Sequence, residues 1–241
     1  MRSNVNRFAA VLIAVLAVAA SGCASVLHKK PEEKPKVVYG YQNFRYLKPS
    51  AEYQTAFNEA QMRYVRLVGK RGNETSEGSG TWIDSETILS CFHMLEPGGI
   101  TFLGEEKKEN ILDVNQILRV SPYFDLSLFQ VEKNPLPVTP VKVAQKVDVG
   151  EELVSYGNAR AVNGYLKLYH VAKIMSEGRF IYLQEAAMPG TSGSALFNLK
   201  GELVGVMTRD VTGPISEDGR TSVAFSVATG PTMLAKFVLH D

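Results

Sequence analysis

Residues 188–198, MPGTSGSALFN, place a serine, Ser192, between Gly190 and Gly193. A serine hydroxyl performs acyl transfer when a base takes its proton, an acid holds that base in the correct tautomer, and backbone N–H groups bind the oxyanion. A serine among glycines is also common in ordinary tight turns. Whether Ser192 is a nucleophile therefore depends on the base and the acid that the rest of the chain supplies.

Histidine is the scarcest of these groups, because the chain contains only four. His28 lies in a charged stretch, and His240 is the penultimate residue. His170 alternates within a strand-like run, which favours a packed or surface side chain. His93 remains, at the end of the apolar run ILSCFHML, and becomes the candidate base if its surroundings support that role.

Three segments resemble the chymotrypsin-like serine proteases. GSGTWIDSETILSCFHML is similar to the strand-turn-strand that ends at the family's catalytic histidine, here His93. SPYFDLSLFQVE, 32 residues on, resembles the Asp-x-x-Leu segment with Asp125, and PGTSGSAL, a further 67 residues on, resembles the nucleophile loop. Each motif alone is weak, but the three in His–Asp–Ser order, with matching flanks over roughly residues 60–240, are specific.

The resemblance implies a role for each of these residues. Ser192 attacks, His93 is the base, Asp125 orients it, and the N–H groups of Gly190 and Ser192 form the oxyanion hole. Glycine suits position 190 because its N–H must turn toward the substrate, a backbone shape that glycine tolerates best. Thr208 stands where the family often has a hydroxyl that bonds the buried acid, so we expect a hydrogen bond from Thr208 to Asp125.

The order of the motifs excludes an α/β-hydrolase. That class needs Gly-x-Ser-x-Gly, followed by the acid and then the histidine. Here Ser194 takes the place of the last glycine, and the only histidine after Ser192 is His240.

Three residues near Ser192 depart from the family pattern: Thr191 replaces Asp or Asn, Ser194 replaces glycine, and Ala195 replaces proline. The closer resemblance is to disulfide-free bacterial proteases of the high-temperature-requirement and glutamyl-endopeptidase types. Two hypotheses follow, namely a serine endopeptidase without a cofactor or metal, or a catalytically silent barrel that serves as an envelope binding or scaffold module.

The resemblance also implies a pocket for the residue before the cut. Its base and walls would be Ala186, Ala187, Met207, Thr208 and Val223. No acid stands at the base to receive Lys or Arg, and Met207 replaces the histidine of glutamate-specific relatives. Because a buried charge without a partner costs several kcal/mol, we expect an apolar residue there. Arg209 and Asp210 border the same strand and could modify this preference.

The periodicity predicts an all-β fold of two six-stranded Greek-key barrels and a short C-terminal helix. The peptidase domain would span residues 51–241, with barrels at about 60–145 and 146–230 and the helix at 231–240. Residues 51–60 could form a further short helix, and the run at 87–95 is expected to be a strand. Cys91 within that run is either a second reactive thiol or, as free cysteines usually are, part of the core.

The composition of the N-terminal residues predicts that the protein is exported from the cytoplasm. Residues 1–7 carry two arginines and no acid, and residues 8–20 are apolar but too short to span a bilayer. Ala20-Ser21-Gly22-Cys23 resembles the bacterial lipobox, which implies a signal peptide at 1–22 and lipidation of Cys23. Residues 23–50 read as a charged, proline-containing linker.

These features imply a lipid-anchored protein of the bacterial cell envelope, at the outer membrane and facing the periplasm, that acts on protein or peptide substrates. Without residues 1–22, 24 basic and 25 acidic side chains remain. This balance gives no reason to expect a nucleic-acid partner.

Overall fold

The computed structural model describes residues 36–38, 50–71, 74–95, 100–104, 111–131, 138–159, 162–214 and 221–239. The chain divides into two units, Met1–Lys36 and Val37–Asp241. The predicted signal peptide and Cys23 lie outside the described residues, as does most of the predicted linker. The following description concerns the second unit.

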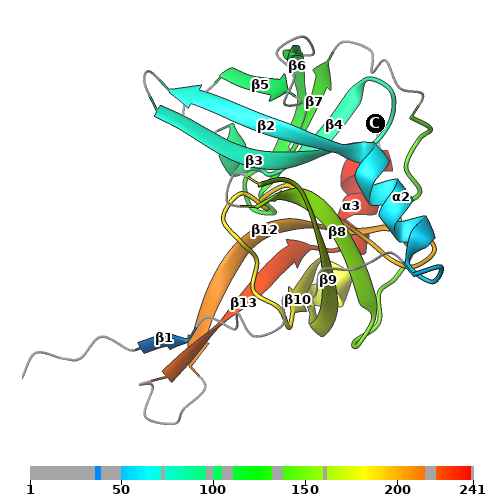
Figure 1. The fold of residues 1–241 in the computed structure, drawn as a ribbon, viewed down its shortest axis with the longest axis vertical. Coiled ribbons are helices and arrows are strands. Elements are labelled where there is room, and N and C mark those ends of the chain that lie inside the picture. Colours follow the sequence, from blue (N-terminus) through cyan, green and yellow to red (C-terminus); the bar gives the residue numbers. More distant parts are fainter. Residues whose placement is uncertain are drawn as a thin grey trace, which may run out of the picture. The chain divides into compact units, whose positions relative to one another are not determined.

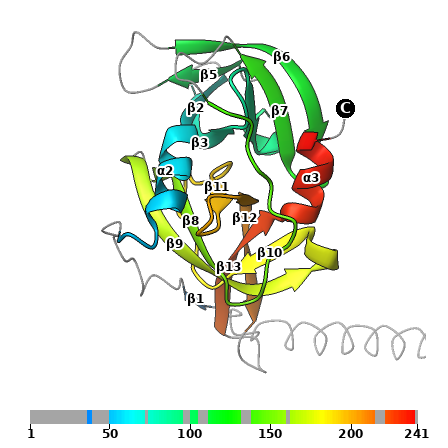
Figure 2. The same cartoon turned by 90° about the vertical axis from the view of Figure 1, so that its right-hand side faces the viewer.

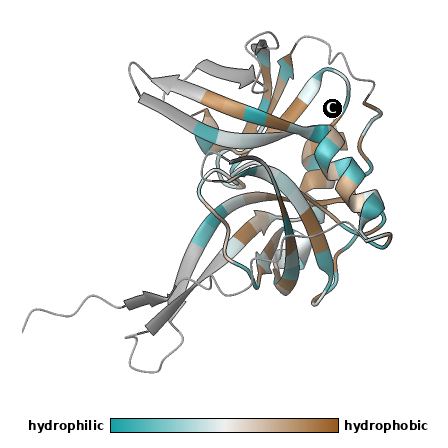
Figure 3. Ribbon diagram, viewed as in Figure 1, coloured by the Kyte–Doolittle hydropathy of each residue, from teal (hydrophilic) through white to brown (hydrophobic). Residues whose placement is uncertain are grey.

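Strands β2 to β7 form a closed antiparallel barrel (Figure 1). Their order around the barrel is β2-β3-β4-β7-β6-β5. Alternation along β2 shows why it forms: Val65 and Leu67 are buried, while Arg66 between them is partly exposed. Hydropathy changes accordingly along the strand (Figure 3). The strands are β2 (Tyr64–Arg71), β3 (Glu74–Trp82), β4 (Thr87–Ser90), β5 (Ile100–Gly104), β6 (Ile111–Ser121) and β7 (Leu126–Val131).

The remaining strands form a second sheet that closes on itself. Its order is β1-β13-β10-β9-β8-β11-β12, and an additional pairing between β12 and β13 joins the ends of the last six into a ring. The strands are β1 (Lys36–Val38), β8 (Glu152–Ala159), β9 (Val162–Met175), β10 (Phe180–Leu183), β11 (Ala195–Phe197), β12 (Leu203–Pro214) and β13 (Thr221–Thr229). The expected all-β fold with two six-stranded barrels is thereby confirmed.

Two α-helices flank the junction of the barrels on opposite sides (Figure 2). Helix α2 (Gln54–Arg63) leads into β2 of the first barrel but packs on β8 and β11 of the second. Helix α3 (Pro231–Leu239) is the expected C-terminal helix, and it receives a hydrogen bond from Arg119 of β6 to the Phe237 carbonyl at 2.7 Å. No helix in the described ranges is long and apolar enough to cross a membrane.

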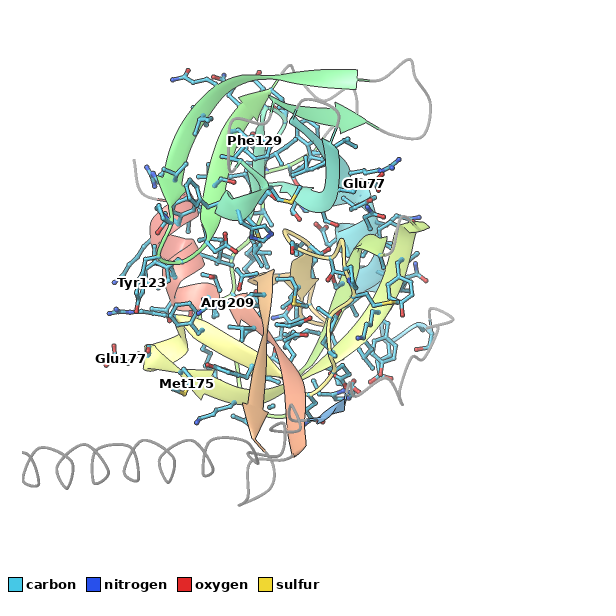
Figure 4. All side chains as sticks on the ribbon, turned by 90° about the vertical axis from the view of Figure 1, so that its left-hand side faces the viewer. Glu77, Tyr123, Phe129, Met175, Glu177 and Arg209 are labelled. Atoms are coloured by element: carbon cyan, nitrogen blue, oxygen red, sulfur yellow. The ribbon has the colours of Figure 1, made fainter. Side chains whose placement is uncertain are left out.

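The hydrophobic core is continuous across the junction. One cluster of buried side chains contains Phe129 of the first barrel (Figure 4), Phe197 of the second and Phe237 of α3. A second cluster fills the rest of the second barrel. Packing of this kind fixes how the two barrels of this unit meet, and the candidate active site lies at that meeting point.

Two sequence-based boundaries are corrected. The N-terminal helix continues to Arg63, because the buried Arg63 side chain pairs with Glu59 at 2.7 Å and donates to the Thr139 carbonyl at 2.9 Å. The strand expected at 87–95 ends at Ser90, and His93 instead lies in a short 3-10 helix, η2 (Phe92–Met94). A second 3-10 helix, η3 (Ser176–Gly178), connects β9 to β10.

Candidate active site

Strand pairing brings His93 and Asp125 together. Strands β4 and β7 are neighbours, with Ser90 opposite Ser127, so the residues beyond these ends also lie close. Asp125 accepts two hydrogen bonds from one residue: its Oδ1 lies 2.9 Å from the backbone N of His93, and its Oδ2 lies 2.7 Å from Nδ1 of the ring. Two contacts to the same carboxylate fix the imidazole in orientation.

The backbone of Asp125 adopts a strained conformation where it contacts His93. Its φ is +54°, in the left-handed region, at the end of a turn in which its N–H donates to the Pro122 carbonyl at 3.2 Å. Aspartate tolerates this region better than most side chains, but the conformation still costs of order 1 kcal/mol. The preceding residue, Phe124, is held from the second barrel by Thr229, whose Oγ1 donates to its carbonyl at 2.7 Å.

The 188–194 loop begins with a tight turn. The N–H of Thr191 donates to the Met188 carbonyl at 3.0 Å, with Pro189 and Gly190 at the two central positions. Gly190 has a φ of +95°, and a type II turn requires positive φ at this position and favours proline before it. Within the part of the chain that the structure describes, the N–H groups of Gly190 and Ser192 donate to no acceptor.

Gly193 is required by close packing. Its φ is +83°, and a Cβ added there would lie 1.9 Å from the Ser79 carbonyl oxygen. Its N–H donates to the Met207 carbonyl of β12 at 2.8 Å. The glycine that follows the candidate nucleophile therefore lies between β3 of one barrel and β12 of the other, where no side chain fits.

The structure brings His93 and Asp125 into contact, but it forms no hydrogen bond between His93 and Ser192. The side chain of His93 is 40% exposed, and Ser192 is partly exposed. The ring and the hydroxyl are thus both accessible from solvent. Catalytic hydrogen bonds are often long in unliganded enzymes and tighten when substrate binds.

Thr208 does not make the expected contact with Asp125. Its Oγ1 donates instead to the Val227 carbonyl at 3.0 Å. Besides His93, the side chain of Cys91 lies close to Asp125, with its Sγ within 4.8 Å of the carboxylate. Cys91 is fully buried, as interpreted from the sequence. Its Sγ donates to the Met207 carbonyl at 3.0 Å, and burial, followed by the charge of Asp125, raises the pKa of the thiol.

Cys91, His93 and Asp125 offer ligand atoms that all lie within 4.8 Å of one another. The chemistry does not fit a zinc site. The thiol donates to the Met207 carbonyl, and the 2.7 Å separation of the ring nitrogen and the carboxylate is shorter than the roughly 3.3 Å between ligands of a tetrahedral zinc ion. This geometry suits a proton-sharing pair rather than two ligands of one metal.

A small pocket adjoins Ser192, with a volume of about 110 Å³. Of the residues expected to form the substrate pocket, Ala187, Met207 and Thr208 line this pocket, whereas Ala186 is buried and does not line it. The side chain of Val223 lies outside those that the structure describes. The complete lining is Ala187, Met188, Pro189, Thr191, Ser192, Met207, Thr208, Arg209 and Asp210.

A polar network underlies this pocket. Ser226 Oγ receives the N–H of Ala187 and donates to Asp210 Oδ1 at 2.9 Å. The Lys167 ammonium donates to the Ala186 carbonyl and lies 4.4 Å from the centre of the Tyr169 ring. Burial raises the pKa of Asp210 and lowers the pKa of Lys167 to about 8.

Lys167 was missed from the sequence, although a signal was present. It shares a strand face with Tyr169 and Val171, both buried, because side chains two residues apart point the same way. The alternation of GYLKLYHV therefore placed a lysine inside the barrel.

Lys167→Met should change how stability depends on pH. The pKa of Lys167 is about 8 in the folded chain against an ordinary 10.5, so between these values the unfolded state binds more protons. The free energy of unfolding of the wild type should therefore rise with pH across this window, by about 3 kcal/mol relative to Lys167→Met. Urea unfolding from pH 7 to 10.5 measures this. The exposed Lys173→Met is the control, and a pH-independent difference for Lys167→Met would contradict the burial of a charged lysine.

The comparisons with known proteins agree with this geometry. A family model described as "Trypsin-like peptidase domain" matches residues 78–206, more than half of the chain. The chain is 24% identical over 174 residues to the "Probable periplasmic serine endoprotease DegP-like" of Marinomonas sp. (strain MWYL1), covering 68% of this chain and 35% of the relative. It is 30% identical over 108 residues to a protein of the same name from Pseudomonas putida (strain GB-1), covering 40% of this chain and 22% of the relative. The chain thus spans about a fifth to a third of the length of these relatives.

Solved structures share the fold. The serine endoprotease from Yersinia pestis aligns with a TM-score of 0.63 and 21% identity, covering 79% of this chain and 66% of that one. The HtrA-type protease AlgW with tripeptide aligns with a TM-score of 0.60 and 22% identity, covering 79% and 62%. With its two-barrel fold and a family match over more than half of its length, the chain belongs to the family of trypsin-like peptidase domains.

Proposed function

We propose that this protein is a serine endopeptidase that hydrolyses peptide bonds through an acyl-enzyme on Ser192. The observation that carries the proposal is the two-point contact of Asp125 with the backbone N–H and the Nδ1 of His93. It leaves the Nε2 of the ring as the nitrogen that can accept a proton from a serine hydroxyl.

The chemistry follows from these positions. His93 Nε2 takes the proton of Ser192 as Oγ attacks the substrate carbonyl carbon, and the carbonyl oxygen becomes an oxyanion. The N–H groups of Gly190 and Ser192, which donate to no acceptor among the described residues, are available to bind it. The tetrahedral intermediate collapses, the C–N bond breaks, and His93 returns the proton to the leaving amine. Water, deprotonated by His93, then hydrolyses the ester.

The alternative is a catalytically silent barrel that binds a partner. The observation that favours it is that His93 and Ser192 form no hydrogen bond. In addition, the loop around Ser192 carries Thr191, Ser194 and Ala195 where the family usually has other residues. In that case the family fold is retained as a binding module.

A fluorophosphonate probe separates the two functions. We expect covalent labelling of the wild type and none of Ser192→Ala, because the probe reacts only with an activated serine. Ser194→Ala is the matched control from the same loop, since Ser194 is buried, and it should be labelled within threefold of the wild type. A folded wild type that is not labelled supports the silent barrel and contradicts the peptidase.

We further propose that the residue before the cut is apolar. The pocket beside Ser192 is lined by Ala187, Met188 and Met207, and Asp210, which also lines it, has its carboxylate bonded to Ser226. A charged side chain in the apolar part would lack a partner. Profiling with a peptide library should show kcat/KM at least about 10-fold higher for apolar residues than for Lys, Arg or Glu. A preference for Lys or Arg would instead make Asp210 the specificity residue.

We propose that the substrates are proteins or peptides of the periplasm, reached by a domain tethered through a lipid on Cys23 and the linker 23–50 at the outer membrane. The lipobox-like sequence before Cys23 supports this, and the relatives are named as periplasmic. Cys23→Ser in the full chain should move the protein from the membrane fraction to the soluble fraction. Retention in the membrane fraction would contradict the anchor.

A further inference from the structure

We propose that Ser79, in the first barrel, is a positioning residue that holds the 188–194 loop of the second barrel in its oxyanion-binding conformation. Ser79 lies in the middle of the Gly78-Ser79-Gly80 stretch of β3 and is fully buried. Among the described residues it forms no hydrogen bond with His93 or Asp125, and it takes no part in the proton transfer described above. The inference deepens the proposed peptidase function and rests on it.

Ser79 makes two hydrogen bonds to the loop. Its backbone N–H donates to the Ser192 carbonyl at 2.8 Å, and its Oγ donates to the Gly190 carbonyl at 3.1 Å. One residue of the first barrel therefore binds two carbonyls of the loop that carries the candidate nucleophile.

These two carbonyls bracket the peptide group that matters for the oxyanion. The Gly190 carbonyl belongs to the peptide group before Thr191, and the Ser192 carbonyl belongs to the one before Gly193. The peptide group between them carries the N–H of Ser192. Because peptide groups are planar and the chain turns only at φ and ψ, the two bonds to Ser79 leave this N–H only the rotation of its own peptide group, about ψ of Thr191 and φ of Ser192.

The direction of the Ser79 hydroxyl is itself fixed. Its oxygen accepts the backbone N–H of Asn158 at 2.9 Å, so its single proton is left to bond Gly190. The Asn158 side chain donates to Glu77 at 3.0 Å, and Glu77 pairs with Arg66. The hydrogen bond from Arg66 lowers the pKa of Glu77, which keeps the carboxylate charged. Glu77 lies at the level where the barrels meet (Figure 4).

Glycines stand on both sides of Ser79 in crowded surroundings, and Gly78 lies next to the loop. A Cβ on Gly78 would lie 2.6 Å from the Met94 sulfur and 3.3 Å from the Ser192 carbonyl oxygen. A Cβ on Gly80 would lie 2.9 Å from Ile88. The Gly-Ser-Gly stretch thus combines one hydroxyl that binds the loop with a glycine, Gly78, beside the Ser192 carbonyl and another, Gly80, that packs against Ile88.

The test compares Ser79→Ala with Thr81→Ala. Thr81 is also buried on β3, two residues along the same face, and it makes no described contact with the loop. We expect Ser79→Ala to lower kcat by roughly 10- to 100-fold with little change in KM, since the loss falls on the transition state. Its affinity for a peptide aldehyde, which forms a tetrahedral adduct, should fall by a similar factor, while affinity for the matching product peptide should not. Thr81→Ala should stay within threefold of the wild type.

Hydrogen exchange of the amides of residues 188–194 tests the same contact without catalysis. Exchange there should be faster in Ser79→Ala than in Thr81→Ala. Unchanged exchange and unchanged kcat in Ser79→Ala would overturn the role of Ser79, whereas faster exchange in a protein without activity would retain the contact and contradict the peptidase. If Ser79→Ala does not fold, Ser79→Cys, with a weak donor of similar size, replaces it in both measurements.

Discussion

Hydrogen bonds that cross from one barrel to the other hold each segment that carries a candidate catalytic residue. Next to His93, the Cys91 thiol donates to the Met207 carbonyl at 3.0 Å. Next to Asp125, the Phe124 carbonyl receives Thr229 at 2.7 Å. Ser192 itself is held through its carbonyl by Ser79 at 2.8 Å. The candidate base and acid come from one barrel and the candidate nucleophile from the other. The distances between them therefore depend on the contacts that hold the two barrels together.

Most of these contacts use backbone atoms, and this explains the composition of the motifs. Glycine stands at 193 because its backbone approaches the Ser79 carbonyl, and at 78 and 80 a side chain would overlap the side chains of Met94 and Ile88. The strained backbone of Asp125, with its φ of +54°, persists because the cross-barrel bond to Phe124 and the contacts to His93 both hold it there. Small residues and a strained backbone conformation are therefore found where the two barrels meet.

The sequence allowed the all-β fold to be predicted, because apolar and polar residues alternate regularly along several strands, although the long strand β6 (Ile111–Ser121) was missed. Short elements such as β11 (Ala195–Phe197) were missed, since three residues carry no period. The pairing of His93 with Asp125 followed from family motifs. The partner of Thr208 could not be predicted, because its choice between Asp125 and the Val227 carbonyl depends on side-chain direction within the packed barrel. Lys167 was overlooked because lysine is rarely buried, although its strand parity indicated the interior.

The central claim is that Ser192, His93 and the N–H groups of Gly190 and Ser192 act on one tetrahedral centre. A crystal structure of the protein with a peptide boronate tests it most directly. The account predicts boron bonded to Ser192 Oγ, one boronate oxygen within hydrogen-bond distance of both N–H groups, and His93 Nε2 in contact with the adduct. A boronate that does not bond Ser192, or an adduct with the Gly190 N–H turned away from it, would contradict the account.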